Sequence, residues 1–436
     1  MNGTIRVTGG TKLIGEVTPI PNKNSILPAL AASILTTQTT TYKNVPKSTD
    51  VQNILEMLKL LGAQIDDSDF NNLKIDGSQI NKFSVDENLG SKIRASILFA
   101  GPLLARFGKA EIPIPGGCVL GYRHIGTHID NFKKMGVRVE EYNNKVVLTK
   151  EGNSNTTTVW QLEASPTATE NLIMYAAGIN SETKIIGAAT EPHVTQVVQM
   201  VQNMGATVTG IGSNTLTIVG NTNLQGTDFS LYPDHIDIIG YIVATAITKG
   251  NIKILGANNY EIMGGIIDLF RKFNLSITED GNNIIVDGSQ ELKIDTHKGD
   301  FPLAGTNLPK LVARPWPGFP VDGLPPMITL ACKLQGKLLV QNWMYETGLD
   351  VINELNNMGA NIFMADPQKA IVFGPINFTG GQITPPAIIQ SAMAVFLASL
   401  ADEVETTISG VDILKRRYPD IFEVYKNLGA HIEVLS

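Results

Sequence analysis

The chain has few cysteines, few charged residues and no long hydrophobic run, and each shortage excludes a class of protein. Two cysteines, Cys118 and Cys332, among 436 residues cannot form a disulfide framework. No apolar run reaches the roughly 20 residues that span a bilayer, so we expect no membrane insertion. Charged residues make up 17% of the chain and sum to −7, which argues against nucleic acid and anionic membranes as partners.

The remaining composition is that of a well-packed globular protein. Hydrophobic residues make up 43% of the chain, and 436 residues exceed the size at which one hydrophobic core normally stops growing. The sequence therefore predicts two domains. Residues 4–8 already read as a strand, with no signal-peptide pattern before them, so we expect a cytoplasmic, monomeric enzyme.

A unit recurs six times along the chain. In each copy an amphipathic helix runs into a short turn of the Leu/Met-Gly-Ala type and then into a β-branched strand. The turn glycine, replaced by Asn in the fourth copy, falls at positions 62, 136, 205, 274, 359 and 429. This period is too long for a solenoid and suits a small subdomain repeated six times. Each turn residue is placed where a helix ends in the left-handed conformation.

Each unit also contains a helix that is apolar on all faces, as expected of a buried helix. These helices are predicted at residues 25–35, 94–104, 168–177, 236–247, 326–334 and 390–400. Three buried helices per half predict two pseudo-symmetric α/β domains with the helices inside. Pro-rich crossings near Pro21 and Tyr232 divide the chain into residues 21–232 and residues 1–20 with 233–436. The N-terminal strand should therefore pack on the C-terminal domain.

Two segments have the residue types of an anion or nucleophile site. Cys118 follows two glycines and precedes Arg123 by five residues, and a nearby cation lowers the pKa of a thiol. A tight turn holding an inert cysteine remains equally open. Lys23 and Asn24 precede the first buried helix, where a cation and an amide at a helix N-terminus can bind an anion. The alternative is an N-capping Asn24 beside a solvated lysine.

Three further positions carry charge close to predicted buried helices. Arg94 opens the second of these helices. Asp322 follows a Pro- and aromatic-rich loop at residues 315–320 and serves either a site or a helix cap. The run of residues 415–417, Lys-Arg-Arg, is either an anion clamp or a solvated turn. Cys332 lies within an apolar helix and should be core. The sequence predicts no metal site and no cofactor.

Taken together, these motifs resemble the enolpyruvyl transferases over the full length of the chain. The resemblance rests on the six repeats and on residues 21–25, 93–96, 105–108, 115–118, 191–192 and 319–322. It implies a two-domain inside-out α/β barrel of six βαβαββ-type repeats, three per domain, with a mobile loop at Cys118. The nearest branch of the family moves the enolpyruvyl group of phosphoenolpyruvate to the 3-hydroxyl of UDP-N-acetylglucosamine, in peptidoglycan precursor synthesis. Phosphate leaves through a tetrahedral intermediate.

The resemblance also implies roles for individual residues. Asp322 would be the base for the sugar hydroxyl, and Cys118 the acid thiol that fosfomycin alkylates in the family. Arg94 would support the Cys118 loop, and Glu346 would line the phosphoenolpyruvate site. The phosphate ligands would be Lys23, Arg123 and Arg416, and the contacts to the sugar nucleotide would be Asn24 and Ser165.

Several positions depart from the family pattern. Gly348 and Ile389 stand where the family has the two arginines that hold the phosphoenolpyruvate carboxylate, and Ala387 replaces an acid. Losing both arginine contacts would cost about two to four orders of magnitude in binding, unless Arg314, Arg417 or Gln390 substitutes. Glu163 replaces a lysine that binds the diphosphate of the acceptor. Three hypotheses follow: the family reaction, a relative with a different nucleoside or sugar acceptor, or a non-catalytic ligand-binding paralogue.

Overall fold

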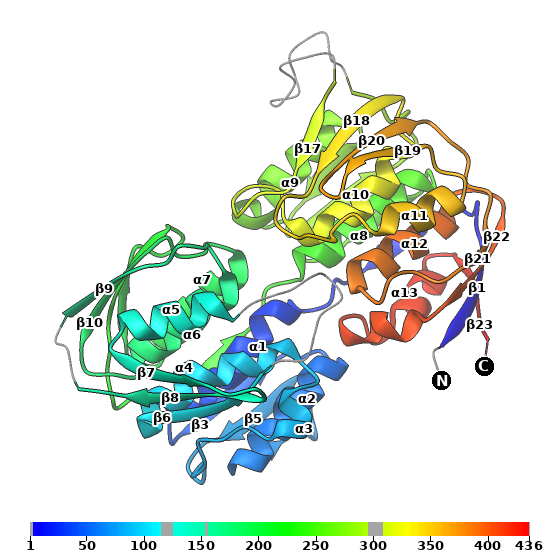
Figure 1. The fold of residues 1–436 in the computed structure, drawn as a ribbon. Helices are drawn as coiled ribbons and strands as arrows, with labels where there is room; N and C mark the ends of the chain where they lie inside the picture. Colours follow the sequence, from blue (N-terminus) through cyan, green and yellow to red (C-terminus); the bar gives the residue numbers. More distant parts are fainter. Residues whose placement is uncertain (1–2, 115–124, 153–155, 295–307, 436) are drawn as a thin grey trace. The chain divides into compact units, whose positions relative to one another are not determined.

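The computed structural model describes residues 3–114, 125–152, 156–294 and 308–435. They form two compact units, shown in Figure 1. The described part of the N-terminal unit is residues 21–114, 125–152 and 156–232, and that of the C-terminal unit is residues 3–20, 233–294 and 308–435. Among the described residues, no helix has the length and apolarity needed to cross a membrane.

In the described part of the N-terminal unit, the strands form three small sheets, in the orders β13-β3-β5-β4, β6-β8-β7 and β11-β12-β10-β9. The strands are β3 (Thr39–Lys43), β4 (Gln64–Asp66), β5 (Asn72–Asp76), β6 (Lys109–Pro113), β7 (Val137–Glu141), β8 (Lys145–Lys150), β9 (Thr156–Trp160), β10 (Glu182–Ile186), β11 (Thr207–Thr209), β12 (Thr215–Val219) and β13 (Asp228–Ser230). The helices are α1 (Lys23–Ala32), η1 (Ser33–Leu35), α2 (Thr49–Leu61), α3 (Glu87–Gly90), η2 (Arg94–Phe99), α4 (Ala100–Phe107), α5 (Gly126–Lys134), α6 (Pro166–Ala177) and α7 (Pro192–Asn203).

The C-terminal unit repeats this plan. Its described strands form sheets in the orders β21-β22-β1-β23, β15-β16-β14-β2 and β17-β18-β20-β19. The strands are β1 (Thr4–Thr8), β2 (Ile14–Val17), β14 (Asn251–Ile254), β15 (Ser276–Asp280), β16 (Asn283–Asp287), β17 (Lys310–Val312), β18 (Gly336–Gln341), β19 (Ile362–Asp366), β20 (Lys369–Gly374), β21 (Gly381–Ile383), β22 (Glu405–Ser409) and β23 (His431–Leu435). The helices are α8 (His235–Ile247), α9 (Tyr260–Lys272), η3 (Val321–Gly323), α10 (Leu324–Ala331), α11 (Val351–Asn357), α12 (Ile389–Ala401), η4 (Val411–Arg416) and α13 (Ile421–Asn427).

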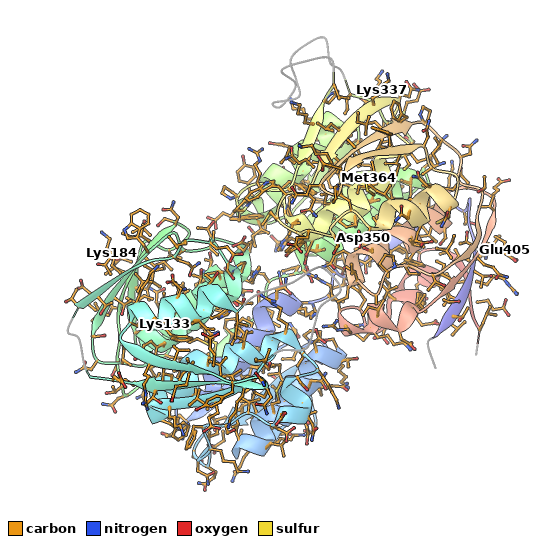
Figure 2. All side chains as sticks on the ribbon, viewed as in Figure 1. Lys133, Lys184, Lys337, Asp350, Met364 and Glu405 are labelled. Atoms are coloured by element: carbon orange, nitrogen blue, oxygen red, sulfur yellow. The ribbon has the colours of Figure 1, made fainter. Side chains whose placement is uncertain are left out.

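The helices predicted to be buried are the inner helices of the two units. Every residue of α8 and of α10 is buried, as apolarity on all faces requires. The observed ends differ from the prediction by a few residues, and the second predicted helix divides into η2 and α4. Charged side chains such as Lys133, Lys184 and Lys337 are exposed on the outer elements, where Figure 2 shows them. The α/β fold class with inner helices is therefore confirmed.

The inner helices of each unit pack against one another. In the N-terminal unit, a Cβ placed on Gly178, after α6, would lie 2.8 Å from Ala105 Cβ of α4 and 2.9 Å from Leu35 Cδ2 of η1. The C-terminal ends therefore meet, and the N-termini of α1, η2 and α6 lie at the opposite end. In the C-terminal unit Thr329 Oγ1 of α10 donates to the carbonyl of Ala394 in α12 at 3.0 Å, and Gly240 of α8 lies against Met393 of α12. Clustered N-termini favour bound anions.

The repeated turns adopt the backbone conformation that the sequence predicts. The five glycines have φ angles between 75° and 112°, and Asn274, which replaces glycine in the fourth copy, has φ 65°. Asn is a residue type that tolerates this left-handed region without a large steric cost. The predicted helix ends are thus confirmed at all six copies.

The N-terminal segment of the chain is fixed to the C-terminal unit by the first turn of α8. Asp234 N donates to the Ile20 carbonyl at 2.8 Å, and Ile20 N donates to Asp237 Oδ2 at 2.9 Å. Strand β1 also pairs with β22 and β23. The buried Asp237 carboxyl is therefore tied to the residue at which the chain enters the N-terminal unit.

Asp237 should make the stability of the protein depend on pH. Burial raises the pKa of Asp237 to about 8; the Ile20 N–H opposes this shift, and the Asp234 carboxylate adds to it. An unfolded Asp titrates near pH ~3.9, so between these values the folded chain binds more protons. The free energy of unfolding should fall as pH rises through this window, by up to about 1.4 kcal/mol per pH unit. Asp237→Asn, whose amide oxygen can still accept from Ile20 N, should remove this contribution in urea titrations at pH 5–9. Equal slopes for the two proteins would contradict the assignment.

Candidate functional site

At the N-terminal end of α1, Lys23 is held in a buried ion pair. Its Nζ lies 2.5 Å from Asp50 Oδ2, and the two side chains are 9% and 4% exposed. The helix is capped by Asn22, whose Oδ1 accepts from the backbone N of Asn24 at 2.9 Å and of Ser25 at 3.3 Å. The alternative of a capping Asn24 beside a solvated lysine is therefore wrong. A buried ammonium at a helix N-terminus has the chemistry of an anion ligand.

Arg94 opens η2 at the same end of the N-terminal unit and lies near His128 of α5. Burial first, and the charge of Arg94 second, lower the pKa of His128 to about 3. The imidazole is consequently neutral at ordinary pH, so it can hold one proton on one nitrogen and accept on the other.

Asn171 fixes which nitrogen of His128 carries the proton. Asn171 Oδ1 accepts from Gly101 N at 2.8 Å, and its Nδ2 donates to the Ile97 carbonyl at 2.8 Å. The same Nδ2 lies 3.0 Å from His128 Nδ1, so Nδ1 is the acceptor. His128 Nε2 then donates to Thr167 Oγ1 at 3.2 Å, which leaves the Thr167 hydroxyl hydrogen for another acceptor.

Glu163 places its own negative charge beside the N-terminus of α5. Its Oε2 accepts from Thr127 Oγ1, in the first turn of α5, at 2.6 Å. Its carbonyl accepts from the backbone N of Ser165, the residue that precedes α6, at 2.7 Å. A carboxylate is favoured at this position by the helix dipole. A diphosphate placed here would meet the Glu163 charge.

In the C-terminal unit, Asp322 lies in η3 and makes no side-chain cap to η3 or α10, so the capping alternative is wrong. Its Oδ2 lies 3.4 Å from Nη1 of Arg417. Arg417 in turn pairs with Asp234: Nε donates to Oδ2 at 2.8 Å and Nη2 to Oδ1 at 2.9 Å. Asp234 also caps α8 by accepting from Ile236 N at 3.0 Å. The structure thus brings two acids and one arginine to the N-terminal ends of α8 and α10.

The basic run at residues 415–417 is neither one clamp nor one solvated turn. Lys415 Nζ pairs with Asp412 at 2.8 Å on the surface, Arg416 is half-buried, and Arg417 is fully buried. Because both edges of the Arg417 guanidinium are engaged, Arg417 cannot replace an arginine that would hold a substrate carboxylate. The sequence did not predict Asp234 or its pairing with Arg417, because three consecutive basic residues before Tyr418 give no local signal for either.

Glu346 is exposed, and the neighbouring Gly348 is built into a closed turn. Asn342 is buried, and its Oδ1 accepts from the backbone N of Met344 at 3.2 Å and of Tyr345 at 3.3 Å. A Cβ on Gly348 would collide with Nδ2 of Asn342. The turn therefore has no space for a side chain at residue 348.

Gly348→Ala should therefore be destabilising, by about 1–3 kcal/mol, because Asn342 must leave the position from which it holds the turn. Gly265→Ala is the matched control. Gly265 is an exposed helical glycine of α9 with no atom within 4 Å of an added Cβ, and its replacement should stabilise by about 0.5–1 kcal/mol. Thermal unfolding of both variants tests the pair. A Gly348→Ala protein as stable as the Gly265→Ala protein would contradict the argument.

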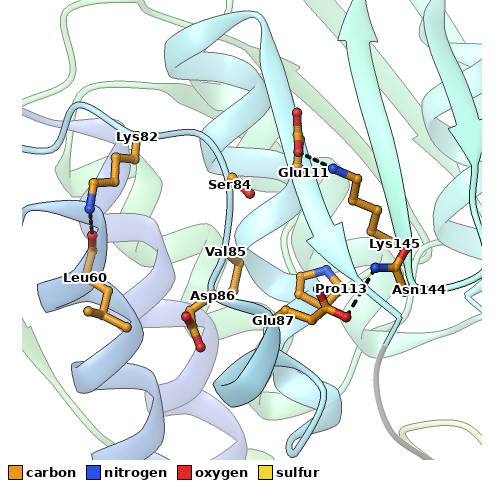
Figure 3. A pocket seen from close by; sticks show the side chains of 10 residues that line it. All are labelled: Leu60, Lys82, Ser84, Val85, Asp86, Glu87, Glu111, Pro113, Asn144 and Lys145. Carbon is orange, nitrogen blue, oxygen red and sulfur yellow. Dashed lines mark hydrogen bonds and ion pairs between the residues drawn. The ribbon is translucent and has the colours of Figure 1, made fainter.

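A pocket of about 330 Å³ lies on the N-terminal unit, where Figure 3 shows its polar lining. Lys145 Nζ donates to Glu111 at 2.8 Å and Asn144 Nδ2 to Glu87 at 3.2 Å, so its charged groups largely satisfy one another. Pro113 also lines it, and none of the predicted site residues does. Cys118 and Arg123 lie outside the described residues.

Known proteins of one family resemble this chain along almost its entire length. The family model of EPSP synthase (3-phosphoshikimate 1-carboxyvinyltransferase) matches residues 7–425. The chain is 34% identical to the UDP-N-acetylglucosamine 1-carboxyvinyltransferase of Treponema denticola over 98% of both chains. It is 35% identical to the enzyme of that name from Bradyrhizobium diazoefficiens, over 98% of this chain and 97% of the relative.

Solved structures of two other proteins have the same fold as this chain. The enolpyruvyl transferase NikO from Streptomyces tendae matches with a TM-score of 0.87 at 20% identity, over 100% of both chains. EPSP synthase from Acinetobacter baumannii matches with a TM-score of 0.75 at 17% identity, also over 100% of both chains. The predicted inside-out α/β architecture is the one that these structures share.

Proposed function

The chain belongs to the EPSP synthase family and is a carboxyvinyl (enolpyruvyl) transferase, and we propose that its acceptor is the 3-hydroxyl of UDP-N-acetylglucosamine. The observation that carries the proposal is the similarity of 34–35% to enzymes of that name along almost the entire chain. The reaction would join the enolpyruvyl group of phosphoenolpyruvate to the sugar and release phosphate. Peptidoglycan precursor synthesis in the cytoplasm would then be the setting.

The proposed chemistry begins with addition to the double bond of phosphoenolpyruvate. The hydroxyl oxygen bonds to C2 while its proton passes to Asp322, and the π electrons take a proton at C3 from Cys118. The tetrahedral intermediate then loses a C3 proton and phosphate. Lys23, Arg123 and Arg416 would hold the phosphate, since each offers charged N–H donors. The position of Lys23 at the start of α1, with its Nζ beside Asp50, supports this assignment.

The proposed substrate contacts follow from the same resemblance. Asn24 and Ser165 would contact the sugar nucleotide, and Glu346 would line the phosphoenolpyruvate site. Arg94 would belong to the substrate-binding residues and support the Cys118 loop. None of these roles requires a metal or a cofactor.

A second candidate is an acceptor without a diphosphate, such as a different sugar or nucleoside. The observation that favours it is Glu163, whose carboxylate is fixed by Thr127 in the first turn of α5. Electrostatic repulsion would weaken binding of a diphosphate at this place.

Phosphate release tests both candidates. Purified protein with phosphoenolpyruvate and UDP-N-acetylglucosamine should release phosphate at rates of about 1–1000 per second if the first proposal holds. Weak release with this acceptor and faster release with one that lacks the diphosphate would favour the second. Binding without release from any acceptor tried would indicate the non-catalytic role. Isothermal titration with each substrate separates absent binding from absent chemistry.

A further inference from the structure

We propose that Arg417 is a positioning residue that holds the Asp322 carboxylate in the orientation from which it accepts the proton of the acceptor hydroxyl. The inference rests on the proposed function, because it takes Asp322 as the base. It gives a role in the reaction to Arg417, whose buried pairing excludes it as a ligand of the substrate carboxylate. Arg417 follows η4 and reaches the N-terminal ends of both α8 and η3.

The geometry fixes the guanidinium before it meets Asp322. Arg417 is 1% exposed, and it donates from Nε and Nη2 to both oxygens of Asp234. Such a two-bond contact sets the plane of the guanidinium. Asp234 is itself fixed, because Oδ1 accepts from Ile236 N and its backbone N donates to the Ile20 carbonyl. Nη1 therefore points in a defined direction.

Asp322 contacts this fixed guanidinium through one of its two carboxylate oxygens. Arg417 Nη1 lies 3.4 Å from Oδ2, and the Asp322 side chain is 21% exposed, so the carboxylate is partly open. Because Oδ2 is engaged, Oδ1 is the oxygen that can accept a proton from a bound hydroxyl. Two carboxylates and one guanidinium carry a net charge of −1, which leaves one negative charge for the proton.

The residues around Arg417 determine its charge and that of the neighbouring His235. Although burial alone would lower the pKa of Arg417, the carboxylates of Asp234 and Asp322 raise it overall, so the guanidinium stays charged. Burial lowers the pKa of His235 to about 4, so this neighbour is neutral at ordinary pH. The His235 ring lies 5.8 Å from the ring of Trp316, on the loop that precedes η3. Among the described residues around Asp322, neutral His235 therefore adds no positive charge, and Arg417 is the cation paired with Asp322.

The test needs variants that fold. Arg417→Met alone would leave Asp234 buried without its cation, whereas Asp234→Asn/Arg417→Met removes the pair together, a change that is often tolerated. Arg417→Lys retains the charge but not the two-bond geometry. The control is Arg271→Met, on an exposed arginine of α9 in the same unit, 3.3 Å from Asp268. Steady-state phosphate release from phosphoenolpyruvate and UDP-N-acetylglucosamine gives kcat and both KM values, and circular dichroism confirms folding.

We expect Asp322→Asn to lower kcat by about 10²–10⁴-fold, the usual contribution of a general base. Asp234→Asn/Arg417→Met should lower kcat by roughly 10–100-fold with both KM values within about threefold, since misplacing a reacting group by 1 Å can cost about 10². Arg417→Lys should recover part of this loss. Adding Asp322→Asn to the double variant should cause no loss beyond that of Asp322→Asn alone, because a positioning residue acts only through its base.

Each other outcome contradicts the proposed function, the assignment of Asp322 as base, or the positioning role of Arg417. No release by the unsubstituted protein contradicts the proposed function and, with it, this inference. Full activity of Asp322→Asn removes the base assignment and the inference. If Asp322→Asn loses activity while the folded double variant behaves like Arg271→Met, or if the losses simply multiply, Arg417 has no positioning role and the proposed function stands.

Discussion

Lys23→Met is expected to destabilise the N-terminal unit by about 3–5 kcal/mol, the usual cost of removing one member of a buried ion pair. The Nζ of Lys23 lies 2.5 Å from a carboxylate oxygen of Asp50, and both side chains are almost fully buried. Methionine fills a similar volume but brings no charge, so the Asp50 carboxylate would lose its nearest cation. The same change removes a donor from the proposed phosphate site.

Urea unfolding followed by circular dichroism measures the loss. Lys59→Met is the matched control, because Lys59 Nζ pairs with Asp67 at 2.9 Å but both side chains are about 40% exposed. Its cost should stay within about 1 kcal/mol, as for other surface pairs. The double variant Lys23→Met/Asp50→Asn should regain much of the stability while phosphoenolpyruvate binding, read by titration, stays weak. Equal stability of the Lys23→Met and Lys59→Met proteins would contradict the buried-pair argument.

Local features of the fold could be predicted because their causes are local. A helix that ends in a left-handed residue needs glycine or a tolerant substitute such as Asn274, and this need appears directly in the sequence. Apolarity on all faces likewise identified the inner helices, including α8. The first residue of a helix could not be predicted in this way, because capping by Asn22 rather than Asn24 depends on backbone geometry that a residue type alone does not reveal.

The partners of the charged residues could not be predicted in the same way. Arg417 and Asp234 are 183 residues apart in the sequence, and their pairing depends on how the fold brings the end of η4 to the start of α8. The sequence therefore could not decide whether Asp322 belongs to a functional site or caps a helix. It also could not decide whether residues 415–417 bind an anion or form a solvated turn. It also offered Arg417 as a substitute carboxylate ligand, which its buried pairing excludes. Charge identifies candidates for a site, whereas burial decides which of them face a ligand.

The substitution Glu163→Lys should strengthen binding of UDP-N-acetylglucosamine. In the resemblance to the family, this position faces the diphosphate of the acceptor, and here it carries a carboxylate fixed by Thr127 at 2.6 Å. Replacing a repelling charge by an attracting one adds a charge-assisted contact, worth about 1.5–3 kcal/mol. Because Glu163 is exposed and partly screened by salt, we expect the dissociation constant to fall by roughly 10–100-fold.

Isothermal titration at fixed ionic strength measures this change. Glu163→Gln should give an intermediate constant, since it removes the repulsion without adding attraction. Glu151→Lys is the control, because Glu151 is an exposed acid of the same unit that pairs with Arg138 at 3.2 Å, and its replacement should leave acceptor binding unchanged. The affinity for phosphoenolpyruvate alone should stay constant in all three variants. If the affinity for UDP-N-acetylglucosamine is also unchanged in Glu163→Lys, the diphosphate does not bind at this position. If that affinity falls, Glu163 contacts the acceptor directly, and the proposal of an acceptor without a diphosphate gains support.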